Sequence, residues 1–87
     1  MVEKNKNIAN IDIEAYKKAL EKFKKIEPIE DVLFNQGITD IMLIGIMPES
    51  VDTITVVLYD TPKNRREEPR LIRQHKEFKV NYQFGKI

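Results

Sequence analysis

Two apolar runs lie close together in the middle of this 87-residue chain, at Ile41–Met47 and at residues 54–59, with a short polar segment between them. In the first run apolar side chains occupy both alternating positions, a pattern typical of a strand that is buried on both faces. A chain of this length forms one domain and has little material for a core. The two runs therefore raise the question of what covers both of their faces.

The chain before these runs is predicted to be helical. One apolar stripe with helical spacing is formed by Ile13, Tyr16, Leu20, Phe23 and Ile26. Asn10 or Asp12 can cap the start of this helix, and Pro28 ends it because the residue before a proline avoids helical angles. A short second helix is expected from Pro28 to Leu33. Gly37 is a plausible stop in the left-handed conformation.

Three strands are predicted after Gly37. Residues 77–84 alternate cleanly between apolar and polar side chains, which indicates a half-buried strand after the two apolar runs. Residues 60–69 carry prolines and many charges, and we expect them to form a polar loop. The predicted fold class is α+β, with one amphipathic helix plus a short helix packed on a three-stranded antiparallel meander. Residues 1–10 are expected to be a flexible tail and residues 11–87 a single domain.

This order leaves one face of the predicted sheet without a cover, because a single amphipathic helix covers only the other. We expect Met42, Ile44 and Ile46, or alternatively Ile41 and Leu43, to point to the uncovered face. A small monomer seldom exposes a contiguous apolar patch. Self-association or docking to a partner protein is the natural explanation. The alternative is that the short helix and the long loop fold back as a lid.

The net charge of +1 hides an uneven distribution. Residues 36–61 contain acidic side chains and no basic one, whereas residues 63–76 are rich in Lys and Arg. Long cationic side chains bind phosphate backbones in a salt-sensitive way, and they also bind acidic protein surfaces. We take Arg65, Arg66 and Arg70 as the candidate charged contact, with nucleic acid as a weakly supported partner.

Residues for catalysis or metal binding are scarce. The chain has no Cys and a single His, His75, which we expect at an exposed loop or strand-edge position without a ligand role. The three glycines stand apart, so there is no glycine-rich phosphate loop. We therefore expect no enzymatic activity, no cofactor and no metal. No apolar segment approaches the roughly 20 residues that a membrane-spanning helix needs, so no membrane contact is expected.

The order of features over residues 40–80 resembles small virion proteins of tailed phages that act as minor capsid, neck or tail-completion proteins. The shared order is an apolar strand, Pro48-Glu49-Ser50 with Asp52, a second apolar strand, Asp60-Thr61, a loop with prolines, and a strand that begins with an aromatic residue. The chain departs from that pattern at Val51, where the family often has Pro, and at residues 63–67, where it has a glycine-rich loop. Family members also continue into a further helix that has no counterpart here.

The resemblance implies a non-enzymatic structural protein of the head–tail junction in a virion that is assembled in the host cytoplasm. Such a protein acts by self-association, as a homo-oligomer, and by contacts with other virion proteins. The residues that we expect to make these contacts are Met42, Ile44 and Ile46, and Arg65, Arg66 and Arg70. The alternative is a small regulatory module, such as a phage-encoded inhibitor, that uses residues 63–76 to bind nucleic acid or an acidic protein.

Overall fold

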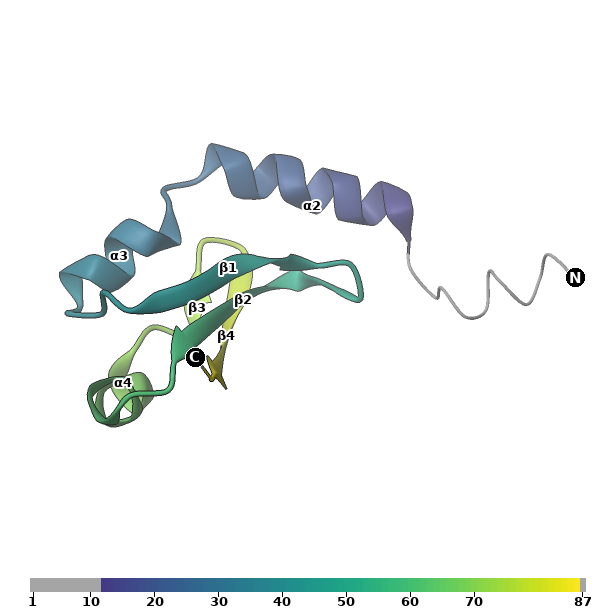
Figure 1. The fold of residues 1–87 in the computed structure, drawn as a ribbon. Coiled ribbons are helices and arrows are strands. Elements are labelled where there is room, and N and C mark those ends of the chain that lie inside the picture. Colours follow the sequence, from purple (N-terminus) through teal and green to yellow (C-terminus); the bar gives the residue numbers. More distant parts are fainter. Residues whose placement is uncertain (1–11, 87) are drawn as a thin grey trace, which may run out of the picture.

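Residues 12–86 are described by the computed structural model, and they form three helices, one 3-10 turn and four strands. Figure 1 shows a long helix, α2, above a twisted sheet, with the shorter helices α3 and α4 at one end. The α+β class predicted from the sequence is confirmed. The predicted flexible tail, residues 1–10, lies outside the described residues.

Helix α2 (Ile13–Lys25) begins after Asp12, one of the two cap positions that the sequence predicts. The carboxylate of Asp12 accepts a hydrogen bond from the backbone N–H of Ala15 at 3.1 Å, as an N-cap residue does. The apolar stripe packs on the core from Tyr16 onward, and the ring of Phe23 meets Phe78 edge-on at 6.2 Å between centroids. Ile13, the first residue of the stripe, is 55% exposed and takes no part in the packing.

Helix α3 (Ile29–Asn35) follows directly after Pro28. It buries Ile29 and Leu33 completely and leaves its other sides to the solvent. Gly37 has a φ of 93°, so the predicted left-handed stop is confirmed at a position where other residues would be strained.

The sheet contains four strands in the order β1-β2-β4-β3. The strands are β1 (Ile41–Met47), β2 (Ser50–Tyr59), β3 (Gln74–His75) and β4 (Phe78–Gly85). The pairs β1–β2 and β3–β4 are antiparallel, but β4 lies parallel to β2. The prediction of a three-stranded antiparallel meander was therefore wrong in strand number and in the direction of the last long pairing.

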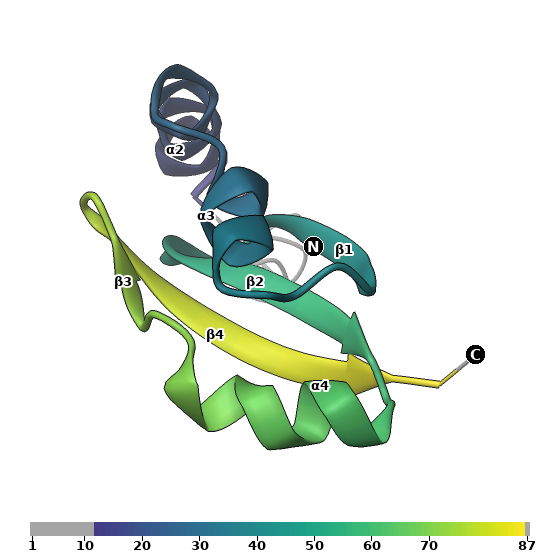
Figure 2. The same ribbon diagram turned by 90° about the vertical axis from the view of Figure 1, so that its left-hand side faces the viewer.

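The connection between β2 and β4 explains this difference. Instead of a loop it contains helix α4 (Pro62–Glu67) and a 3-10 turn (Glu68–Arg70). Thr61 caps α4 by accepting a hydrogen bond from the backbone N–H of Asn64, and Pro62 occupies the first turn, where its missing N–H is harmless. A long connection with a helix lets the chain return in the parallel direction, which a hairpin does not allow. Figure 2 shows α4 running alongside the C-terminal half of β4.

The core lies on one face of this sheet. The strand registers place Ile46 beside Ile54 and Ile54 beside Val80, and all three are at most 5% exposed. Helix α3 contributes Leu33 to the same core, and the segment after α4 contributes Leu71. Helices α2 and α3 and the segment after α4 therefore pack on the same face, which we call the helix face.

An irregularity in β1 changes which of its residues share a face. Ile41 pairs with Leu58 while Leu43 pairs with Val57, so Met42 is an extra residue on β1. A residue inserted in this way shifts the alternation of side chains on one side of the bulge.

The expectation that Met42, Ile44 and Ile46 share one uncovered face is corrected by this geometry. Ile46 is only 4% exposed, and Ile44 is partly buried against the core, whereas Met42 is 36% exposed. The alternative pair is split as well, because Ile41 packs against the core and Leu43 is 52% exposed.

The two faces of β1 should differ in their effect on stability. Ile46→Ala removes buried methyl groups and should lower the free energy of unfolding by about 2–4 kcal/mol. Leu43→Ala removes a half-exposed side chain and should lower it by less than about 1 kcal/mol. Urea unfolding of both variants measures the difference, and equal losses would contradict the assignment of the two faces.

Candidate protein-contact surface

The face of the sheet opposite the helices carries the strongest candidate for a functional surface. We call it the open face. The buried side chains of α2 and α3 belong to the core on the helix face. By register and alternation, the residues of the open face include Leu43, Gly45, Met47, Thr53, Thr55, Val57, Lys79, Asn81, Gln83 and Gly85.

Apolar side chains gather on the β1 side of the open face. Leu43, Met47 and Met42 are exposed by 52%, 41% and 36%. We call these three residues the apolar row. Exposed apolar side chains grouped on one strand mark contact sites more often than isolated ones do.

Met42 joins the apolar row because of the bulge. Its side chain reaches across Val57 toward the last residue of β4, Gly85. A Cβ atom at Gly85 would lie 2.8 Å from the sulfur of Met42, so a larger residue there would require the Met42 side chain to move. The chain therefore positions Met42 on the open face although the plain alternation of the strand does not predict it.

The β4 side of the open face is polar and hollowed. A shallow hollow of about 580 Å³ extends over Thr53, Thr55, Lys79 and Asn81, with Met47 at its apolar end. Thr55 is only 5% exposed, and Gly45 and Asn81 flank it in register. The hollow offers hydroxyl, amide and ammonium groups for hydrogen bonds. Among residues 12–86, Glu49 is the carboxylate that lines it, and these residues offer no carboxylate pair for acid–base chemistry there.

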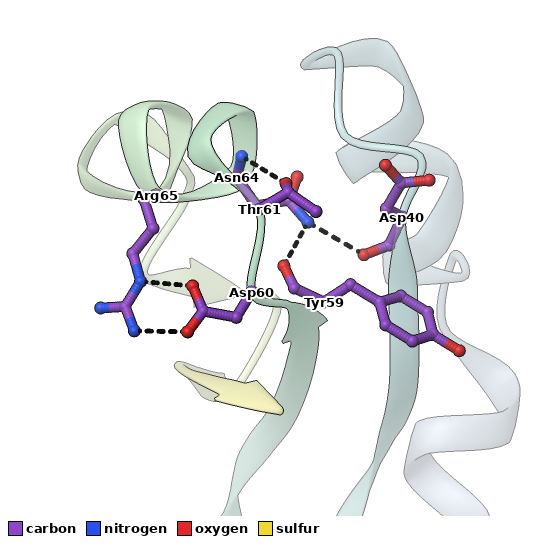
Figure 3. A network of polar contacts seen from close by, with 6 residues as sticks. All are labelled: Asp40, Tyr59, Asp60, Thr61, Asn64 and Arg65. Atoms are coloured by element: carbon purple, nitrogen blue, oxygen red, sulfur yellow. Dashed lines mark hydrogen bonds and ion pairs between the residues drawn. The ribbon is translucent and has the colours of Figure 1, made fainter. Parts of the chain in front are cut away.

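A buried amide links the ends of the strands to α4, as Figure 3 shows. The Asn64 side chain is 1% exposed, and its Nδ2 donates to the carbonyl oxygens of Tyr59 at 2.8 Å and of Asp40 at 3.1 Å. The backbone N–H of Tyr59 also donates to the carbonyl oxygen of Asp40. This contact was missed in the sequence. The Thr61-Pro62 helix start was the signal that could have revealed a helix, though not the partner carbonyls.

The predicted charged contact lies on α4 and the turn after it, but its cations are largely paired with acids of the same segment. Arg65 makes two hydrogen bonds to the carboxylate of Asp60, at 2.8 and 2.9 Å (Figure 3). Its guanidinium also stacks 4.1 Å from the centre of the Phe84 ring. These hydrogen bonds hold the pKa of the Asp60 carboxyl below its ordinary value. Arg70 bonds Glu67 at 2.8 Å, and the nearest Glu67 oxygen lies 3.8 Å from Arg66.

Tyr82 anchors the returning chain on the helix face. Its hydroxyl donates to the carbonyl oxygen of Ile72 at 2.7 Å, and the guanidinium of Arg73 lies 4.8 Å from the centre of its ring. Burial raises the pKa of the Tyr82 hydroxyl to about 12, against the opposing effect of Arg73. The hydroxyl therefore resists ionisation.

The single histidine, His75, is buried and contacts the backbone of a distant segment. His75 lies in the edge strand β3, which is one of the two positions predicted for it. It is 6% exposed, so it is buried and not at the surface. Its Nε2 is 2.6 Å from the carbonyl oxygen of Glu27, which joins β3 to the segment between α2 and α3. Within residues 12–86 no three His, Cys, Asp or Glu side chains come together in a way that could hold a metal ion.

Comparisons of the chain with known protein families, with curated proteins and with solved structures found no match. No helix in the described part of the chain has both the length and the apolar character to cross a membrane.

Loss of the Asn64 amide should destabilise the fold. In Asn64→Ala the carbonyl oxygens of Tyr59 and Asp40 each keep one backbone donor but lose the amide. Two buried hydrogen bonds of about 0.5–1.5 kcal/mol each are lost, so the free energy of unfolding should fall by about 1–3 kcal/mol. Arg66→Ala, an exposed position in the same helix, should change it by no more than about 0.5 kcal/mol. Chemical denaturation followed by circular dichroism compares the two, and an unaffected Asn64→Ala protein would disprove a structural role of this amide.

Tyr82 should make the protein sensitive to alkaline conditions. Since its pKa is about 12 in the folded state and about 10 in an unfolded chain, folding favours the protonated form. The resulting stability is fully present below pH about 10 and is lost as the pH rises toward 12. Tyr82→Phe should show a smaller loss over that pH window than the natural sequence. Identical pH profiles of the free energy of unfolding would refute the assignment.

Proposed function

We propose that this protein is a non-enzymatic structural protein that acts by self-association and by contacts with other proteins, and that the open face of its sheet makes these contacts. The observation that carries the proposal is the apolar row, Met42, Leu43 and Met47, exposed on that face. Burying such side chains against a partner is favourable by about 25 cal/mol for each Å² removed from water.

The composition of the open face also supports a protein partner. An apolar row beside a polar, hollowed area has the arrangement of a contact surface, in which apolar groups give affinity and a polar surround gives hydrogen bonds. Methionine side chains in the row are flexible and polarizable, so they adapt to the shape of a partner.

The regulatory alternative, binding of nucleic acid or of an acidic protein through residues 63–76, has less support. Arg65 and Arg70 already satisfy carboxylates in their own segment at 2.8 Å, and Arg73 pairs with Glu68. A phosphate or a partner carboxylate would have to compete with these internal acids. Exposed ion pairs are individually weak, so the competition lowers the affinity without preventing contact.

The resemblance over residues 40–80 to phage neck and tail-completion proteins suggests where such a protein works. On this proposal the contacts join copies of the chain and neighbouring virion proteins at the head–tail junction. The role would be to connect or seal, and it would need neither a cofactor nor a catalytic residue.

The solution mass measured by light scattering tests the proposal. At low and at high salt the full chain should form a defined oligomer, because apolar contacts persist when salt screens charges. Leu43→Glu should shift the mass toward that of the 10.3 kDa monomer. The matched control is Ile13→Glu, an equally exposed apolar residue on α2, which should leave the mass unchanged.

Two results would overturn the proposal. One is a monomer at both salt concentrations. The other is an equal effect of Leu43→Glu and Ile13→Glu, which would mean that the open face has no special role. An oligomer that dissociates only at high salt, and that Arg65→Ala with Arg70→Ala abolishes, would favour the charged alternative.

A further inference from the structure

The two edges of the sheet differ sharply in how well they are protected. At one edge, β3 is only two residues long and stands between the charged side chains of Arg73 and Lys76. Short strands and charges are common means by which proteins keep sheet edges from pairing with other chains. The edge formed by β1 has neither protection, since Ile41–Met47 is seven residues long and contains no charged residue.

The outer side of β1 is regular enough to accept another strand. From Leu43 to Ile46 the pairing with β2 runs without interruption, and both irregularities lie outside this stretch. In an edge strand about half of the backbone N–H and C=O groups point away from the sheet. Figure 2 shows β1 at the margin of the sheet, with β2 on its inner side.

We propose that the β1 edge pairs with β1 of a second copy in the antiparallel direction, so that two sheets join into one across a twofold axis at Ile44. This inference rests on the self-association proposed above and specifies its geometry. A twofold arrangement is the usual symmetry of protein dimers and makes the contact self-complementary.

The register follows from side-chain sizes on the open face. When Ile44 stands opposite its own copy, Leu43 stands opposite Gly45 of the partner, and Gly45 opposite the partner's Leu43. A Cβ atom at Gly45 would meet nothing within 4 Å, so the space above this glycine is empty. The exposed side chain of Leu43 would fill that space in the other copy. Leu43 of each copy therefore fills the space above Gly45 of the other copy, so this match occurs twice in one dimer.

The other face of β1 fits the same register. Ile44 is partly buried on the helix face, and opposite its own copy it would extend the apolar surface there. Edge pairing thus gives side chains on both faces of β1 a cross-strand neighbour at once, whereas stacking of two open faces would leave the backbone groups of this edge unpaired. It also places the apolar rows of the two copies side by side.

Disulfide trapping tests this register, and the absence of cysteine from the natural sequence makes the experiment clean. Leu43→Cys and Gly45→Cys proteins are prepared separately and then mixed in a glutathione redox buffer. Residues directly opposite each other in an antiparallel pair have Cα atoms about 4.5–5.5 Å apart, within the range of a disulfide. The mixture should give a covalent dimer several-fold more abundantly than either protein alone, as measured by non-reducing electrophoresis and mass spectrometry.

Control variants separate edge pairing from other contacts. Thr53→Cys lies on the open face one strand further in, so its mixture with Leu43→Cys should not cross-link above the level given by Ile13→Cys. Efficient cross-linking of Leu43→Cys with Thr53→Cys would show stacked open faces and overturn the inference, as would an equal yield from Leu43→Cys alone. Light scattering on the natural sequence distinguishes a failure of the edge pairing from a failure of the self-association. An oligomer without the expected cross-link refutes only the edge pairing, whereas a monomer refutes the self-association as well.

Discussion

The parallel return of β4 beside β2 is the constraint on which the rest of the structure depends. A parallel neighbour requires a crossover, and here the segment after α4 brings Leu71 and Ile72 to the core that already holds side chains of α2 and α3. Because the apolar material outside the strands is used on one face, the open face is left with only its own side chains. The exposed apolar row is thus a product of the topology as much as of the strand sequence.

Local features of the fold were predictable from the sequence, and non-local ones were not. The start of α2 at Asp12, the stop at Gly37 and the strand near residues 78–84 each depend on signals within a few residues. The partner and direction of β4 depend on a long connection whose helix was interpreted as a loop. A capping threonine followed by proline indicates a helix start, but charged residues dominate the segment and suggest solvent exposure.

The candidate surface was predictable only in outline. The pattern of β1 correctly indicates apolar side chains on two faces, but the bulge at Met42 decides which of them share a face. A single extra residue leaves no mark in the sequence, because Met is acceptable at either position. The arginines show the opposite difficulty: their presence is evident, but their pairing with Asp60, Glu67 and Glu68 appears only when α4 forms. Composition counts charges and does not show which are already neutralised.

The bulge also fixes the length of the chain along β1. Asp40, just before the strand, is held through its carbonyl by Asn64, while Ile46 is fixed in the core at the other end. Removing Met42 would restore simple alternation but would pull Asp40 away from the amide that binds it. Adding a residue would turn Ile41 or Ile44 out of the core. Among descendants of this sequence, the strand should therefore vary by substitution on its exposed side and hardly at all by insertion or deletion, even though Met42 itself lies at the surface.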